Sequence, residues 1–185
     1  MSQISRLISN YQKFVCLPWP SNLAGRQRVW FAVYPPAEER RVRARIGEFE
    51  VATLEAKHRW RLIDITNAPA RWLGSHEYRD GYFAEPDALV TIEEDLKAEI
   101  AGQIRGACQA DGVDQDTVVA VLGAGGLFGF THVSSLVAEL EESIRGRLLV
   151  FFPGEYERNL YRFMDARDGF NYMAAPITCS ERLTL

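Results

Sequence analysis

The stretch TVVAVLGAGGLFGFTHVSSLVAEL, residues 117–140, decides the fold. Its first seven residues form an apolar run, which is typical of a strand buried on both faces of a parallel sheet. Apolar residues then recur at helical spacing and predict a helix over residues 131–144, with a buried stripe of Val133, Leu136, Val137, Leu140 and Ile144. A buried strand that leads into an amphipathic helix is the repeating unit of α/β proteins.

Similar units occur on both sides of this stretch. Runs of apolar and β-branched residues predict further strands over residues 28–34, 59–66, 147–154 and 172–178. Helical spacing predicts one helix over residues 38–57, and Thr91 with Glu94 predicts the capped start of another helix. Because strands alternate with helices, we predict a single three-layer Rossmann-like α/β domain, in which helices flank a mostly parallel sheet of about five strands.

The length of the chain, 185 residues, suits one buried core better than two. We divide this single domain into an N-terminal amphipathic helix (1–15), an extended link with two prolines and a glycine (16–27), the core (28–178) and a tail (179–185). The first helix shows its apolar face at Ile4, Leu7, Ile8, Tyr11 and Phe14.

Composition narrows the class of protein. A hydrophobic content of 47% with 11% aromatic residues is that of a globular protein. No apolar run approaches the roughly 20 residues that span a bilayer, and the first residues lack the pattern of a leader peptide, so we expect a cytoplasmic protein without membrane contact. Three cysteines and three histidines without a CxxC pair argue against a disulfide framework and against a structural zinc site.

Charge is distributed unevenly along the chain. Residues 1–75 hold 12 Lys and Arg against 6 Asp and Glu, whereas the remainder holds 9 against 19. Such a division can orient a molecule toward partners of opposite charge. The basic run RRVRAR, residues 40–45, has two interpretations: a contact with nucleic-acid phosphates, or a solvated helix face balanced by neighbouring glutamates, which we favour.

A turn with four glycines, Gly123, Gly125, Gly126 and Gly129, follows the central strand, where many α/β proteins bind nucleotide phosphates. Gly123 and Gly125 match the first two glycines of the dinucleotide fingerprint, but the third position is Phe128, which is too large for close helix packing. A P-loop requires a lysine, and residues 98–185 contain none. We expect these glycines to shape a turn; the alternative is a nucleotide-binding or nucleotide-processing enzyme that uses this loop with Glu155.

Other chemistry has weaker support. If the strands are parallel, Tyr34, Asp64, Thr66 and Glu155 gather at one edge of the sheet. Asp64 and Glu155 could hold a divalent metal or act as acid and base, although we favour Asp64 as a cap of the next helix. No GxSxG motif or comparable nucleophile is present. We therefore predict no catalytic residue, no cofactor and no bound metal.

Aromatic and oppositely charged residues interleave over residues 155–172. This mixture is typical of the anchors of a protein–protein interface, although a long connection held by its own ion pairs would have the same composition. The candidate partner-binding residues are Glu155, Tyr156, Arg162, Asp165, Arg167, Asn171 and Tyr172.

Residues 117–178 resemble the BrxB family, a component of the BREX bacteriophage-exclusion systems. The motif VFFPGEY is followed by YRFMDARDGFNYMAAP, and the matching positions are Phe151, Phe152, Pro153, Gly154, Glu155, Tyr156, Arg162, Asn171 and Tyr172. Upstream, LGAGGLFGFTHVSSLVAEL resembles the family's glycine-rich turn and the helix that follows it.

The resemblance implies a small, non-catalytic adaptor or scaffold subunit of a bacterial anti-phage defence complex. Its expected direct partner is a PglZ-type, alkaline-phosphatase-like protein, in a system that also contains an ATPase and a DNA methyltransferase. Any association with DNA would then be indirect, through these partners.

Overall fold

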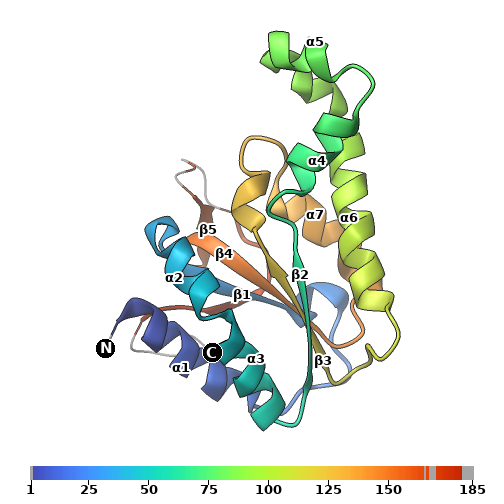
Figure 1. Cartoon of the computed structure of the whole chain (residues 1–185). Coiled ribbons are helices and arrows are strands. Elements are labelled where there is room, and N and C mark those ends of the chain that lie inside the picture. The colour runs from blue at the N-terminus through green and yellow to red at the C-terminus, as the bar shows by residue number, and fades with distance from the viewer. Residues whose placement is uncertain (1, 165, 167–169, 181–185) are drawn as a thin grey trace.

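The computed structural model describes residues 2–164, 166 and 170–180, and it contains a six-stranded sheet (Figure 1). The strands are β1 (Val29–Tyr34), β2 (Arg59–Asp64), β3 (Thr117–Leu122), β4 (Arg147–Glu157), β5 (Leu160–Phe163) and β6 (Ala175–Ile177). Five of them form a parallel sheet in the order β2-β3-β4-β1-β6. The prediction of an α/β fold with a mostly parallel sheet is confirmed.

Side chains of the central strands are buried on both faces of the sheet. Every residue of β1 and β3 is buried, as the apolar runs in the sequence predict. Alternate residues enter different cores: Phe31 and Val33 lie on one face, whereas Trp30 and Ala32 lie on the other. The edge strand β2 is more exposed, because only β3 pairs with it.

Helices complete the two outer layers, as predicted. One face of the sheet is covered by α1 (Gln3–Val15), α2 (Glu39–Ala44) and α3 (Ile46–Glu55), and the other by α6 (Glu93–Gln109) and α7 (Val133–Leu140). α7 buries the predicted stripe of Val133, Leu136, Val137 and Leu140, and a short 3-10 turn, Glu141–Ser143, extends it. Within the described part of the chain, none of the helices has the length and apolar character needed to cross a bilayer.

The prediction of one helix over residues 38–57 is wrong. The backbone leaves the helical region at Arg45, where φ is −118° and ψ is 15°, and α2 and α3 are separate. This break gives the two helices different contacts, because α3 packs beside α1 while α2 lies next to the carboxyl end of β1. At the break, the Arg45 guanidinium donates a hydrogen bond to the Ser5 hydroxyl, which links the junction of α2 and α3 to α1.

β4 and β5 form a hairpin that we did not predict. Arg158 and Asn159 connect the strands with positive φ values of 52° and 64°. Two such residues in succession are characteristic of a type I′ turn, which is usually marked by Asn-Gly or Asp-Gly. The segment after residue 154, which we expected to be a connection, therefore continues the sheet instead. β4 extends beyond its parallel neighbours.

Residues 76–92 form an arm that projects from the body, between α4 (Ala68–Ser75) and α6. The arm contains α5 (Arg79–Ala84) and a 3-10 segment, η3 (Pro86–Ile92). The predicted cap at Thr91 is wrong, because the Thr91 hydroxyl donates to the Ala88 carbonyl inside η3 and α6 begins at Glu93. The helix therefore starts without a side-chain cap.

Candidate functional site

In open α/β sheets, ligands bind beyond the carboxyl ends of the strands, where neighbouring strands send their following segments to opposite faces. Here that position lies between β1 and β4. The segment after β1 forms α2 and α3, which cover one face of the sheet, whereas residues after β4, such as Tyr161, join the core on the other face. The end of β1 is closed by Tyr34, which is buried and donates its hydroxyl to Glu39. Burial and the neighbouring carboxylate raise the pKa of Tyr34.

The glycine turn packs against the loop that follows β2. Gly123 has a φ of +93°, and a Cβ placed on it would lie 2.5 Å from the Thr66 nitrogen. A Cβ on Gly126 would lie 2.7 Å from the Thr66 carbonyl oxygen, and one on Gly125 would lie 3.5 Å from Pro153. Gly129 also has a positive φ, +83°, but has open space around it. Gly123 and Gly126 thus make room for Thr66, which occupies the side of the turn that faces β2.

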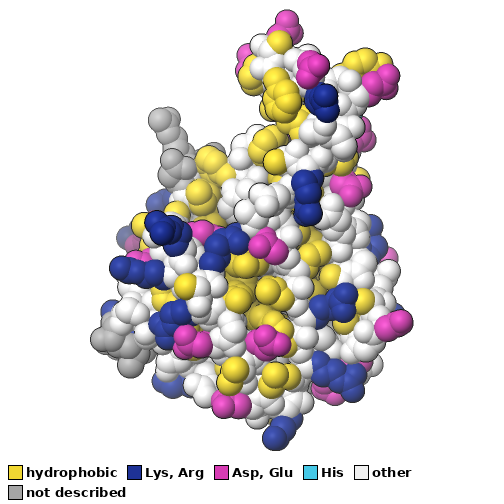
Figure 2. Space-filling view, in the orientation of Figure 1, with side chains coloured by type: hydrophobic (Ala, Val, Ile, Leu, Met, Phe, Trp, Pro, Cys, Tyr) yellow, Lys and Arg dark blue, Asp and Glu magenta, His cyan; other side chains and the backbone are white. Residues whose placement is uncertain are grey.

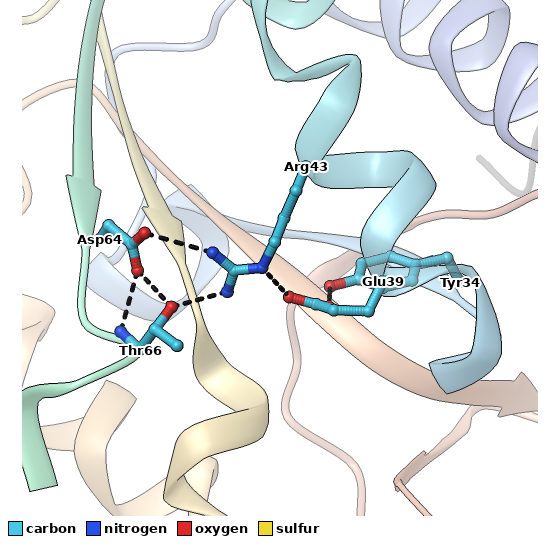
Figure 3. A network of polar contacts seen from close by, with 5 residues as sticks. All are labelled: Tyr34, Glu39, Arg43, Asp64 and Thr66. Atoms are coloured by element: carbon cyan, nitrogen blue, oxygen red, sulfur yellow. Dashed lines mark hydrogen bonds and ion pairs between the residues drawn. The ribbon is translucent and has the colours of Figure 1, made fainter. Parts of the chain in front are cut away.

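A polar network holds Thr66 in this position (Figure 3). Each nitrogen of the Arg43 guanidinium donates to an oxygen: Nε to Glu39 at 2.7 Å, Nη1 to Asp64 at 3.2 Å and Nη2 to the Thr66 hydroxyl at 2.6 Å. The Thr66 nitrogen and hydroxyl both donate to Asp64. Arg43 is therefore held between two carboxylates, and this network links α2 to the end of β2.

Asp64 accepts hydrogen bonds from Thr66, two residues later, and does not cap the next helix, which corrects our prediction. The N-cap position of α4 is Asn67, and it makes no side-chain capping bond. Burial alone would raise the pKa of Asp64, but the hydrogen bonds from Thr66 and the charge of Arg43 lower it below its ordinary value. Asp64 is thus an ionised partner of Arg43.

The second carboxylate proposed for metal or acid–base chemistry, Glu155, also has an arginine partner. It lies opposite Arg162 in the β4–β5 hairpin, with Oε2 3.5 Å from the Arg162 Nη1. Among the described residues, no group of three or more His, Cys, Asp or Glu is arranged to hold a metal ion. Asp64 and Glu155 are therefore each placed to neutralise an arginine.

Most of the basic run 40–45 is paired within the chain. Arg41 lies 2.8 Å from Glu38, and Arg45 lies 2.6 Å from Glu48, in addition to the Arg43 network. These contacts agree with the interpretation of a solvated, charge-balanced helix face. The glutamate–arginine spacing of 39 and 43, one helical turn apart, is a signal of such a pair that our sequence reasoning missed.

The candidate partner-binding residues differ from one another in how far they are exposed to solvent. Glu155, Arg162 and Asn171 are exposed, and Tyr156 is half-buried with its hydroxyl donating to Asn159. Asn171 accepts a hydrogen bond from the Met173 nitrogen, which shapes the turn before β6. Asp165 and Arg167 lie outside the described residues.

Tyr172 is a core residue, which does not fit its predicted place on a contact surface. Only 7% of it is exposed, and its ring packs edge-on against Phe31 and Tyr161. Burial raises the pKa of Tyr172 to about 12. Tyr161, which lies in the stretch 155–172 expected to supply interface anchors or a long connection, is also buried and donates its hydroxyl to the Ala174 carbonyl at 2.7 Å.

An aromatic pocket of about 300 Å³ lies between the glycine turn and the C-terminal segment. Its lining includes Phe128, Phe130, His132, Phe163 and Phe170. Phe128 and Phe170 are partly exposed at this pocket. Sequence reasoning identified Phe128 only as a misfit in a nucleotide motif and gave no signal that it lines a pocket.

We compared the chain with protein-family models, with curated proteins and with solved structures, and none of them matches it. The resemblance of residues 117–178 to the BrxB family therefore stays a prediction.

Proposed function

We propose that the protein is a non-catalytic adaptor of a BREX-like anti-phage defence complex in the bacterial cytoplasm. It acts by contact with other proteins, most directly with a PglZ-type, phosphatase-like partner, and any association with DNA is indirect. The motif resemblance of residues 117–178 supports the defence context. The geometry at the carboxyl edge of the sheet supports action by contact.

The observation that carries this proposal is the packing of Thr66 against Gly123 and Gly126. In a nucleotide-binding turn, glycines leave space so that phosphates can approach the backbone amides. Here the same space holds a threonine that Arg43 and Asp64 fix in place. The packing of the chain against itself accounts for these two glycines and favours an adaptor over the nucleotide-binding alternative.

The contact surface we propose is the β4–β5 hairpin with the rim of the aromatic pocket. Glu155 and Arg162 form an exposed cross-strand pair, and Phe128 and Phe170 expose parts of their rings nearby at the pocket. Aromatic and arginine side chains provide most of the binding energy in typical protein interfaces. Such a surface suits a partner with complementary charges around an apolar projection.

Copurification with a PglZ-type protein tests the proposal. We expect Arg162→Ala to weaken copurification without changing the melting temperature, because exposed ion pairs contribute only about 0–1 kcal/mol to stability. Arg40→Ala, at an exposed position of α2, is the matched control. Unchanged copurification by the Arg162 variant would count against this surface, and no copurification by the wild-type chain would refute the partner.

Calorimetric titration with ATP and NAD, each with and without Mg²⁺, separates the two classes of function. An adaptor without a nucleotide site gives no binding heat in these titrations. Micromolar binding that is lost in a Gly126→Ala variant would instead support the alternative, a nucleotide-binding or nucleotide-processing enzyme that uses the 123–129 turn and Glu155.

A further inference from the structure

The arm, residues 76–92, has almost no core of its own. None of the residues of α5 is buried, and η3 buries only Ile92. Three large apolar side chains on the arm are strongly exposed: Val90 at 72%, Tyr78 at 64% and Phe83 at 62%. Apolar groups gathered on a projection in this way are typical of a surface that another protein covers.

Acidic residues surround these apolar side chains. The arm holds Glu77, Asp80, Glu85 and Asp87 against a single arginine and no lysine; the Nε of this arginine, Arg79, lies 3.5 Å from Asp80. Figure 2 shows hydrophobic and acidic side chains side by side on this projection. The arm therefore carries a net negative charge, which repels nucleic acid and anionic lipid and attracts a basic surface.

A groove of about 240 Å³ lies at the root of the arm. Apolar side chains from three segments line it, namely Trp72 of α4, Leu89 and Val90 of η3 and Phe130 after the glycine turn, and Asp87 and Glu93 add carboxylates. Exposed apolar groups on the arm thus continue into a concave, acid-rimmed surface on the body. This combination suits a projecting basic segment better than it suits a flat surface.

We propose that the arm and its root groove dock a second surface of the partner, a basic segment that carries apolar side chains. This inference rests on the proposed function, since it assumes a protein that acts by contact. Val90 and Phe83 supply the apolar contacts, and Glu85 and Asp87 attract Lys or Arg of the partner. A second copy of this chain suits the arm less well, because the arginines at 41, 43 and 45 are paired with glutamates or aspartate of their own chain.

The test is the affinity of the full chain for the PglZ-type protein, measured by biolayer interferometry at low and high salt. We expect the double variant Phe83→Ser with Val90→Ser to bind at least tenfold more weakly. The double variant Glu85→Lys with Asp87→Lys should weaken binding most at low salt, where charges are least screened. The matched control changes two equally apolar residues of α3, Val51→Ser with Leu54→Ser, which are 53% and 52% exposed and lie off the arm.

The outcomes separate this inference from the proposed function. If the wild-type chain does not bind, the proposed partner fails and the inference fails with it. If the wild-type chain binds, and the arm variants bind equally well while Arg162→Ala weakens binding, only the inference is overturned. If sedimentation shows that the wild-type chain is a dimer and that the arm variants are monomers, the arm serves self-association, and the inference is also overturned. The serine variants keep the fold because both positions are exposed, and equal melting temperatures check this.

Discussion

A series of glycine-to-alanine variants tests the close packing of Thr66 on the glycine turn. Gly123→Ala carries two costs: alanine in the left-handed region, about 1–2 kcal/mol, and a Cβ that would lie 2.5 Å from the Thr66 nitrogen. Forced contacts of this kind in a packed region cost about 1–3 kcal/mol. We therefore expect a loss of about 2–5 kcal/mol in the free energy of unfolding.

Two neighbouring glycines separate these costs. Gly129 has a positive φ but open space for a Cβ, so Gly129→Ala should lose only the backbone cost of about 1–2 kcal/mol. Gly126 has no positive φ but would meet the Thr66 carbonyl oxygen at 2.7 Å, so Gly126→Ala should lose only the packing cost of about 1–3 kcal/mol. Gly102, which is exposed within α6 with no atom near its Cβ position, should gain about 0.5–1 kcal/mol when changed to alanine.

Urea unfolding followed by circular dichroism measures all four variants against the wild-type chain. The expected order of stability is Gly102→Ala above wild type, then Gly129→Ala and Gly126→Ala, and Gly123→Ala lowest. If Gly123→Ala is as stable as Gly129→Ala, Thr66 does not approach the turn as closely as described. The chain itself would then not fill this turn, and the main support for an adaptor would be refuted.

Two further predictions concern a buried tyrosine and a half-buried histidine. Tyr161→Phe should lower the free energy of unfolding by about 1–3 kcal/mol, because it leaves the Ala174 carbonyl without its donor, and unchanged urea stability would contradict that bond. The ring of His58 stacks on that of Trp19, with 3.6 Å between the ring centroids. Burial lowers the pKa of His58 from 6.5, although the charge of Asp116 opposes this shift. Because the unfolded chain binds the proton more readily, the stability that neutral His58 provides is present above pH 6.5 and is lost as the pH falls toward the lower folded pKa. Stability should therefore fall more in the wild-type chain than in His58→Gln between about pH 8 and about pH 5, and equal losses would exclude the shift.

The parallel strands could be predicted because local sequence determines them. Strands buried on both faces of a parallel sheet consist almost wholly of apolar residues, and the runs at 28–34, 117–123 and 147–154 have this composition. The stripe of α7 was equally clear, because four apolar residues at helical spacing fall on one face. In these segments local preference and tertiary burial agree.

The errors occur where a distant contact overrides a local pattern. The Arg158–Asn159 turn lacks the usual glycine, and its positive φ values are stabilised by the pairing of β4 with β5. The break between α2 and α3 at Arg45 is accompanied by a contact of Arg45 with Ser5 of α1, which the periodicity of residues 38–57 does not reveal. Tyr172 seemed exposed because it ends a stretch, 155–172, in which aromatic and charged residues interleave, yet its ring is part of the buried core.

For the candidate site, too, local sequence supported a prediction and distant contacts could not be foreseen. Phe128 and the absence of a lysine are the grounds on which the sequence predicts a structural role for the glycine turn. Thr66 could not be identified as the residue that occupies it, because β2 and β3 are neighbours only in the folded sheet. The arm gave a weaker signal still, since exposed aromatic residues and acids in a turn-rich segment have the same composition as a surface loop.

The two proposed contact surfaces are continuous, and under the proposed function this continuity bears on how firmly one partner is bound. The aromatic pocket beside the hairpin and the groove at the root of the arm share Glu93, Gly129 and Phe130. A partner that binds both surfaces would gain affinity, because binding at the first surface holds the partner at a high effective concentration near the second. The segment between Phe128 and Phe130 therefore joins the two surfaces, and the open space around Gly129 leaves that junction accessible.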